Sequence, residues 1–257
     1  MEIRVLQYFL TIAREQSISG AAEFLHITQP TLSRQMKELE EELGKQLFIR
    51  GNRKITLTDD GMLLRKRAEE IIQLVDKTES EMRADDTEFS GDIYIGGGES
   101  EGMRIIARAI NRAQTEHPLL KFHLFSGNAE DVTDRLDNGL LDFGVLVEPT
   151  NMTKYDFIKL PTKDIWGVLM RKDSPLAALE SVTPKDLRGK PIIFSNQLLV
   201  KNELAGWLGG NERSLNIVTT YNLLYNASLL VEENNHYALC LDGIIHTGEG
   251  SDLCFRP

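Results

Sequence analysis

Apolar residues near the N-terminus recur at helical spacing and predict an amphipathic helix. Four of them follow one another at spacings of four, three and four residues: Leu32, Met36, Leu39 and Leu43. Such spacing gathers them in one stripe along a helix and leaves the polar residues on the other side. Thr28 stands where an N-cap belongs, Pro30 suits a first helical turn, and Gly44 suits the residue after a helix. The pattern predicts a helix that begins after Thr28 and ends before Gly44.

A shorter helix and a basic hairpin flank this amphipathic helix. Ser17 is a candidate N-cap of the shorter helix, whose two adjacent alanines allow two helices to cross closely. Residues 47–50 and 54–57 can pair as strands around a Gly-Asn turn at residues 51–52. A helix, a break, a second helix and a hairpin are the parts of a winged helix-turn-helix, a unit that enters DNA grooves.

The polar side of the long helix and the hairpin supply the candidate DNA contacts. Gln, Ser and Arg side chains can bond to base edges, and Arg and Lys also bond to phosphates. The candidates are Thr28, Gln29, Pro30, Thr31, Ser33, Arg34, Lys37, Arg50, Arg53 and Lys54. For the helix face alone, an ordinary solvated surface is the alternative. Glu38 and residues 40–42, at the far end, are interpreted as a solvated or inter-subunit face.

A long helix with a heptad-like seam is predicted next. Thr58 is its candidate N-cap, and Asp59 and Asp60 suit the positive end of a helix dipole. Six residues then recur at spacings of four and three: Leu64, Ala68, Ile71, Val75, Thr78 and Met82. The first four are predicted to form a dimer interface, because no partner within the same domain is evident. Packing on its own domain is the alternative. The polar residues 84–88 predict a hinge.

From Gly91 onward, strands and helices alternate. The expected strands are residues 92–96, 120–125, 141–147, 165–171, 191–194 and 215–219. The expected helices are residues 101–116, 131–138, 183–187, 202–208 and 223–233. This order predicts an α/β part with a parallel sheet. Two such subdomains resemble a solute-binding-protein fold, which holds a ligand in the cleft between them.

Composition and length are compatible with this division. The predicted domains are a winged helix-turn-helix at 1–58, a linker and dimerisation helix with its hinge at 59–88, and an effector-sensing α/β domain at 91–257, with subdomains 91–160 and 161–257. The net charge of −10 argues against a uniformly basic surface, and a DNA-binding protein needs only a local basic face. No signal peptide and no membrane-spanning apolar run are evident, so a cytoplasmic protein without a membrane partner is expected.

The polar residues that follow strands are the candidate effector contacts. They are Ser100, Asn128, Glu148, Ser195 and Asn196. Three glycines at residues 96–98 invite a dinucleotide interpretation, but Ser100 and Glu101 stand where the third glycine of that motif belongs. Free N–H groups and the Ser100 hydroxyl at a helix start could instead hold an anion or a small polar effector. Asn128 and Asn196 are equally suited to be simple caps or turn residues.

The sequence shows no residue pattern that is typical of an enzyme active site. The five histidines show no metal-ligand spacing, and no nucleophile, base and acid form a recognisable triad. Cys240 and Cys254 do not suggest a disulfide framework; Cys240 lies in an apolar run, as a buried cysteine does, and a redox-sensing pair is the alternative. We therefore expect no catalytic activity, no cofactor and no metal.

The N-terminal motifs resemble those of the LysR-type transcriptional regulators. The match consists of Leu6-x-x-Phe9, Ala21-Ala22-x-x-Leu25, Thr28-Gln29-Pro30-x-x-Ser33, Leu39-Glu40-x-x-Leu43-Gly44-x-x-Leu47-Phe48-x-Arg50 and Leu57-Thr58-x-x-Gly61. The resemblance implies a dimeric or tetrameric DNA-binding regulator that dimerises through the linker helix and senses a small-molecule effector with its C-terminal domain. By position it implies that Gln29, Pro30, Ser33 and Arg34 read the major groove and that Arg53 is the wing contact. It also implies that the turn at Ser100 contributes to the effector pocket.

The chain departs from the family pattern at its C-terminal end. Family members usually continue beyond the equivalent of Pro257, with a strand that returns to the first subdomain and a final helix. From this difference we expect that the last strand and helix are missing and that residues 91–257 are poorly stable. A small-molecule binding protein without a regulatory response, of the periplasmic solute-binding type, is the alternative to a regulator.

Overall fold

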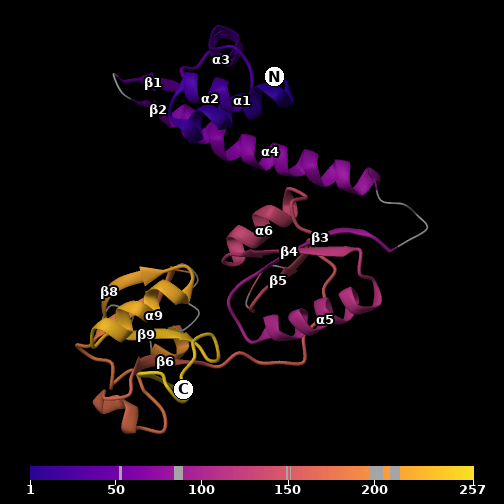
Figure 1. Ribbon diagram of the computed structural model, residues 1–257. Helices are drawn as coiled ribbons and strands as arrows, with labels where there is room; N and C mark the ends of the chain where they lie inside the picture. The colour runs from indigo at the N-terminus through magenta and orange to yellow at the C-terminus, as the bar shows by residue number, and fades with distance from the viewer. Residues whose placement is uncertain (52–53, 84–88, 149, 151, 197–204, 209–214) are drawn as a thin grey trace. The chain divides into compact units, whose positions relative to one another are not determined.

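The computed structural model describes residues 1–51, 54–83, 89–148, 150, 152–196, 205–208 and 215–257 (Figure 1). The chain divides into two compact units, Met1–Ala84 and Asp85–Pro257. Each unit has its own core, so each is described by itself.

The first unit is a winged helix-turn-helix followed by a long helix. Its elements are α1 (Ile3–Glu15), α2 (Ile18–Phe24), α3 (Gln29–Leu43), β1 (Phe48–Arg50), β2 (Ile55–Leu57) and α4 (Asp59–Arg83). The predicted caps are confirmed: the Ser17 hydroxyl accepts the Gly20 N–H, and the Thr28 hydroxyl accepts the Thr31 N–H. Gly44 ends α3 in the left-handed conformation, at φ 63°. Local capping chemistry therefore determines where these helices begin and end.

The break between α2 and α3 has a defined backbone. His26 adopts a left-handed φ of 54°, and the Ile27 N–H donates to the Ala22 carbonyl oxygen at 3.0 Å.

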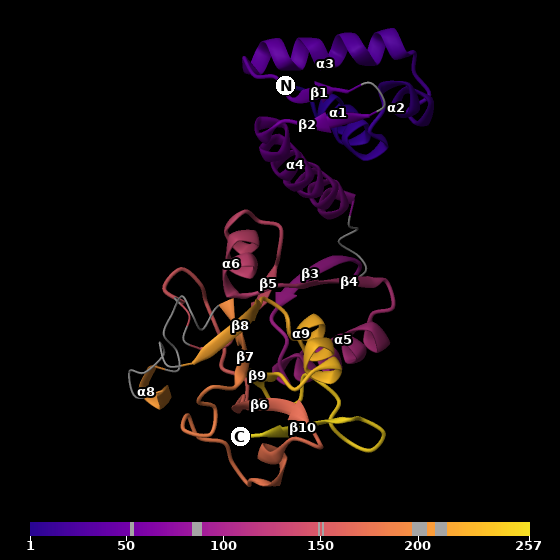
Figure 2. The ribbon, with the colours of Figure 1, turned by 90° about the vertical axis from the view of Figure 1, so that its left-hand side faces the viewer.

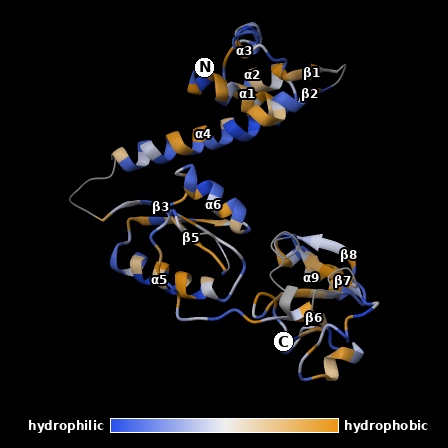
Figure 3. Cartoon of the chain, turned by 180° about the vertical axis from the view of Figure 1, so that it is seen from behind, coloured by the Kyte–Doolittle hydropathy of each residue, from blue (hydrophilic) through white to orange (hydrophobic). Residues whose placement is uncertain are grey.

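Leu32 and Leu39 of α3 are fully buried, as the stripe predicted, and they share one core with Phe9 of α1. Leu43 is 38% exposed, so the stripe ends one turn earlier than predicted. Figure 3 shows hydrophilic and hydrophobic segments alternating along α4, as in an amphipathic helix.

The start of α4 packs against its own domain. The Thr58 hydroxyl accepts the Gly61 N–H at 3.0 Å, and a side chain at Gly61 would collide with the Leu47 carbonyl oxygen. Ala68 is completely buried in the core of the first unit, and Leu64 and Ile71 pack against the same core. The argument that this seam lacks a partner within its domain was therefore wrong for these residues, because α1 contacts α4.

The second unit begins with a parallel sheet. It consists of β3 (Gly91–Gly97), α5 (Gly102–Glu116), β4 (Leu120–Ser126), α6 (Ala129–Asp137) and β5 (Phe143–Val145). The described strands form a sheet of order β4-β3-β5, and both pairings are parallel, as predicted. The two helices lie on opposite faces of this sheet (Figure 1).

A second sheet follows in the same unit (Figure 2). Its elements are β6 (Trp166–Arg171), the 3-10 helix η1 (Pro175–Ala178), β7 (Pro191–Ser195), α8 (Ala205–Leu208), β8 (Asn216–Tyr221), α9 (Leu224–Glu233), β9 (Tyr237–Leu241) and β10 (Leu253–Arg256). The strand order is β10-β6-β9-β7-β8. Alternate residues of β7 enter different cores: Ile192 and Phe194 face one cluster, and Ile193 faces the other, with α9. A sheet that is covered on both faces explains the continuous apolar runs of its strands.

Several sequence predictions for this second sheet were wrong. The sheet is mixed, because β6 pairs antiparallel with both β9 and β10. The strands β9 and β10 were not predicted. Residues 183–187 form turns, not a helix: the Asp186 carboxylate accepts both the N–H and the hydroxyl of Thr183, and Gly189 adopts a left-handed φ of 68°. Of the predicted helix 202–208, residues 202–204 lie outside the described residues.

Candidate DNA interface and effector cleft

The first turns of α3 present the predicted DNA contacts to solvent. Five of the six candidates on this helix are exposed, as is the N-cap, and Ser33 is half-buried; the exposed residues are Thr28, Gln29, Pro30, Thr31, Arg34 and Lys37. The Thr28 and Thr31 hydroxyls lie 2.8 Å apart and fix the start of the helix. The buried stripe of α3 thus leaves its polar side free to meet a ligand as large as a DNA groove.

The two basic side chains of α3 pair with glutamates one turn further along. Arg34 Nε lies 3.7 Å from a Glu38 carboxylate oxygen, and Lys37 Nζ lies 3.4 Å from a Glu41 oxygen. All four side chains are more than half exposed, so these pairs are weak and screened by salt. Phosphates can therefore compete for both cations at little energetic cost.

Glu40 has a structural position that the sequence interpretation missed. One of its carboxylate oxygens accepts the Leu47 N–H at 2.7 Å and the Phe48 N–H at 3.3 Å. It therefore joins the end of α3 to the first strand of the hairpin. The interpretation of Glu40 as part of a solvated or inter-subunit face was wrong for this residue.

The hairpin forms with the predicted pairing. Phe48 faces Leu57, and Arg50 faces Ile55, in an antiparallel register. The Gly51 N–H donates to the Lys54 carbonyl oxygen at 3.0 Å, and Lys54 is exposed. The predicted wing contact Arg53 and the side chain of Arg50 lie outside the described part of the chain, so their roles stay predictions.

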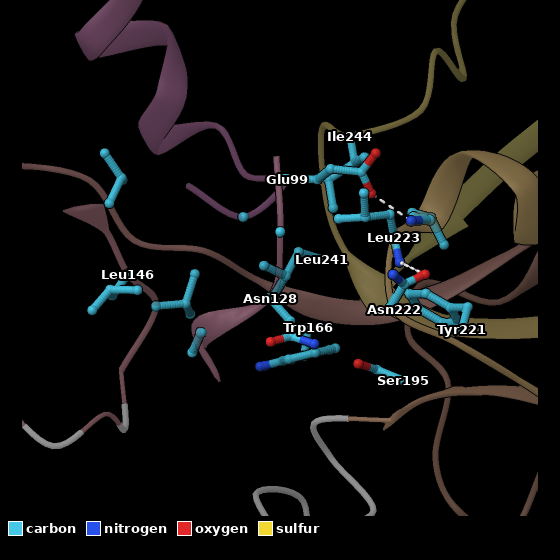
Figure 4. Close-up of a pocket in the computed structure, with 16 residues that line it drawn as sticks. Glu99, Asn128, Leu146, Trp166, Ser195, Tyr221, Asn222, Leu223, Leu241 and Ile244 are labelled. Atoms are coloured by element: carbon cyan, nitrogen blue, oxygen red, sulfur yellow. Dashed lines mark hydrogen bonds between the residues drawn. The ribbon is translucent and has the colours of Figure 1, made fainter. Parts of the chain in front are cut away.

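A cleft lies at the carboxyl ends of the strands of the second unit (Figure 4). It has an empty volume of about 620 Å³, which includes space open to solvent. Two predicted effector contacts line it, Asn128 and Ser195. Asn128 also caps α6: its side chain accepts the Asp131 N–H at 2.9 Å. Ser195 ends β7 and is only 8% exposed.

The three other predicted effector contacts do not line the described wall of the cleft. The Ser100 hydroxyl accepts the Gly102 N–H at 3.1 Å, at the start of α5. Glu148 is exposed and pairs with Lys159 at 3.0 Å. Asn196 is exposed. Each of the three follows a strand, as predicted, and its contact with an effector stays a prediction.

Glu99 is the cleft residue that the sequence interpretation missed. Its carboxylate accepts the backbone N–H of Leu224, the first residue of α9. A carboxylate at this end of a helix satisfies a free N–H and interacts favourably with the helix dipole. Glu99 therefore links the loop after β3 to the start of α9. The sequence offered one signal, an acidic residue directly after the Gly-rich end of a strand.

Two aromatic residues complete the wall. Trp166 begins β6, and Tyr221 ends β8. The Tyr221 hydroxyl donates to the Leu239 carbonyl oxygen at 2.7 Å. Burial raises the pKa of Tyr221 well above its ordinary value, with a smaller contribution from Cys240 and then Glu99. Tyr221 is therefore a neutral, fixed part of the wall.

Neither cysteine is exposed for redox chemistry. Cys240 and Cys254 are free and buried, on strands that are separated by β6. Burial raises the pKa of Cys240 to about 12 and also raises the pKa of Cys254. Within the described residues, no three His, Cys, Asp or Glu side chains are grouped as metal ligands. The described helices include none that is long and apolar enough to cross a membrane.

Known proteins resemble both units. Residues 3–62 match the family model "Bacterial regulatory helix-turn-helix protein, lysR family", and residues 86–249 match "LysR substrate binding domain". The uncharacterized HTH-type transcriptional regulator YvbU of Bacillus subtilis (strain 168) is 31% identical over 194 residues, which are 75% of this chain and 65% of YvbU. A hydrogen peroxide-inducible genes activator of Pectobacterium carotovorum subsp. carotovorum is 32% identical over 198 residues, 76% of this chain and 64% of the activator.

The chain spans just under two thirds of the length of these two relatives. Among solved structures, full-length CbnR complexed with its target DNA superposes with a TM-score of 0.70 over 100% of this chain and 88% of CbnR. The identity is 18%, so this likeness concerns the fold. Because the substrate-binding-domain model alone covers more than half of the sequence, the chain belongs to the LysR family.

Proposed function

We propose that this protein is a sequence-specific transcriptional regulator. The observation that carries the proposal is the exposed first part of α3, where Thr28, Gln29 and Arg34 stand on a helix held by a buried apolar stripe. Gln29 and Arg34 suit base edges, and the cations of α3 and the hairpin suit phosphates. The match to a regulatory helix-turn-helix family over the same residues supports this assignment.

We propose further that the cleft of the second unit binds a small-molecule effector. Asn128 and Ser195 supply polar contacts, and apolar residues supply most of the remaining wall. An effector that binds one conformation better than another shifts the population by its difference in affinity. In this proposal, an occupied cleft favours one conformation of the DNA-bound protein over another.

Dimerisation is proposed to use the exposed apolar residues of α4. Leu64, Ala68 and Ile71 already pack on the core of the first unit. Leu63 and Leu74 remain 59% and 41% exposed, and a half-buried Val75 follows Leu74. Apolar side chains of this size favour burial against a second copy of the chain. A dimer would also present two copies of α3 to the two halves of an operator.

The decisive experiment is an electrophoretic mobility shift with promoter fragments at fixed salt. Arg34→Ala is expected to weaken specific binding by about 1–3 kcal/mol and to relax sequence preference. Arg112→Ala is the matched control, because Arg112 is an exposed arginine of α5 that pairs with a glutamate one turn away. Unchanged DNA affinity in Arg34→Ala, or an equal loss in Arg112→Ala, would contradict the assignment of α3.

A small-molecule binding protein without a regulatory response is the second candidate, because the cleft alone would suffice for it. The same mobility shift separates the two candidates. If the wild-type chain binds no DNA fragment specifically but binds ligands, the second candidate is correct.

A further inference from the structure

Glu99 is the only charged side chain among the described residues that line the effector cleft. One of its carboxylate oxygens accepts the Leu224 N–H. Its other oxygen makes no hydrogen bond to any described residue. An ionised carboxylate offers about four acceptor sites, so Glu99 can hold α9 and still accept hydrogen bonds from a ligand.

The helix ends at this cleft do not favour an anionic ligand. The N-terminus of α9 already carries the Glu99 carboxylate. The N-terminus of α6 is closed by a capping box, in which Asn128 and Asp131 satisfy each other's backbone N–H groups. The described lining includes no lysine, arginine or histidine. A ligand carboxylate would therefore meet the charge of Glu99 without a cation to balance it.

The rest of the lining suits an apolar body that carries a polar group. Trp166 and Ser195 both line the cleft, from β6 and β7, and are labelled in Figure 4. Ser195 is 8% exposed as a whole residue, and its hydroxyl has no hydrogen-bond partner among the described residues. The indole ring of Trp166 offers a large apolar surface. Leu241 and Ile244 add apolar surface next to Glu99.

We propose that the cleft selects an effector that carries a protonated amine on a small apolar body. The ammonium group binds the free oxygen of Glu99, the apolar body lies against Trp166 and Leu241, and Ser195 bonds to a polar group of the ligand. This inference rests on the proposed effector-sensing function of the second unit. It names the chemical class of the effector and makes Glu99 its specificity-determining residue.

The test uses the fluorescence of Trp166 in the full chain. The sequence contains two tryptophans, so Trp207→Phe leaves Trp166 as the single indole. This variant is titrated at constant ionic strength with benzylamine, benzyl alcohol and benzoate, which share one ring and differ in charge. Benzylamine is expected to bind with a Kd on the order of tenfold lower than benzyl alcohol, a difference of about 1.4 kcal/mol. Benzoate is expected to bind more weakly than either.

Glu99→Gln separates the charge from the link to α9. Glutamine keeps a carbonyl oxygen that can accept the Leu224 N–H, but it carries no charge. The tenfold preference for benzylamine is expected to vanish in Glu99→Gln. The preference should persist in Glu116→Gln, which removes an exposed carboxylate at the far end of α5. Glu99→Asp is a second variant that keeps the charge and should retain part of the preference if Glu99→Gln fails to fold.

Three outcomes would overturn the proposal. Benzoate as the tightest probe, strengthened by Glu99→Gln, would mean that an anion displaces Glu99 from α9. Equal binding of the three probes would mean that Glu99 does not select. No saturable change with any probe would mean that the cleft does not take this class of ligand. The mobility shift on the same preparations distinguishes these failures from failure of the regulator function, because DNA binding by α3 does not require an amine.

Discussion

Replacement of Glu40 by alanine should lower the free energy of unfolding of the first unit. Its carboxylate accepts the Leu47 N–H at 2.7 Å and the Phe48 N–H at 3.3 Å. Leu47 and Phe48 are only 1% and 6% exposed, so water cannot easily replace the lost acceptor after Glu40→Ala. A buried donor that is left without an acceptor costs about 1–3 kcal/mol.

The two hydrogen bonds do not contribute equally. The bond at 2.7 Å has the length of a charge-assisted hydrogen bond, whereas the bond at 3.3 Å exceeds the usual range. We therefore expect Glu40→Ala to lower the free energy of unfolding of the first unit by about 2–3 kcal/mol. For a unit of this size, that corresponds to a fall in Tm of roughly 10–20 °C. Glu40→Gln keeps one carbonyl acceptor and should lose about 1 kcal/mol.

The assay is urea unfolding followed by circular dichroism, with amide hydrogen exchange at Leu47 and Phe48. Trp166 and Trp207 both lie in the second unit, so their fluorescence reports separately whether that unit changes. Glu41→Ala is the matched control, because Glu41 is exposed on the same helix and, among the described residues, its side chain pairs only with Lys37. Equal stability of Glu40→Ala and Glu41→Ala, or unchanged exchange at both amides, would refute the reasoning.

Three further predictions concern assembly, pH and the thiols. Leu74→Ser should dissociate the proposed dimer in sedimentation without lowering the stability of the first unit, because Leu74 is exposed. Leu64→Ser should instead lower the stability of the first unit, because Leu64 packs on its core. The reverse pattern would contradict the α4 interface. Burial, and then the charge of Glu101, raise the pKa of Asp164, so its ionisation opposes folding as the pH rises through that raised pKa. Asp164→Asn should therefore stabilise the protein in thermal unfolding at neutral pH and not at about pH 3; a gain of the same size at both pH values would refute this. Cys240 and Cys254, whose pKa values burial raises, should react with a thiol reagent at pH 8 only after denaturation, and fast reaction of the native protein would contradict their burial.

The first unit could be predicted well because its signals are local. The hydroxyls of Ser17 and Thr28 cap N–H groups three residues away, so both partners of each hydrogen bond lie within one short stretch of sequence. The errors concern contacts that are distant in sequence. Ala68 packs on the core that α1 helps to form, and no spacing within α4 distinguishes such a seam from a dimer seam.

The second sheet was harder to predict because its central strand lacks alternation. All five residues of β9 are buried, so the strand presents a continuous apolar run that resembles any buried segment. The run around Cys240 was noticed in the sequence, but only as the environment of a cysteine. Residues 183–187 were predicted as a helix but form turns, because the Asp186 carboxylate accepts hydrogen bonds from Thr183 and favours a turn.

The candidate cleft marks where prediction from sequence fails and why. A residue at the end of a strand can be expected near a cleft, and this expectation correctly brought Asn128 and Ser195 to its wall. It does not determine which of two neighbours turns inward. Ser100 turns to the Gly102 N–H, two residues away, whereas Glu99 turns to the Leu224 N–H, 125 residues away. The start of α9 supplies the N–H group that orients Glu99, and no motif around Glu99 contains that partner. The residue that we propose to select the effector therefore becomes identifiable only when α9 is in place.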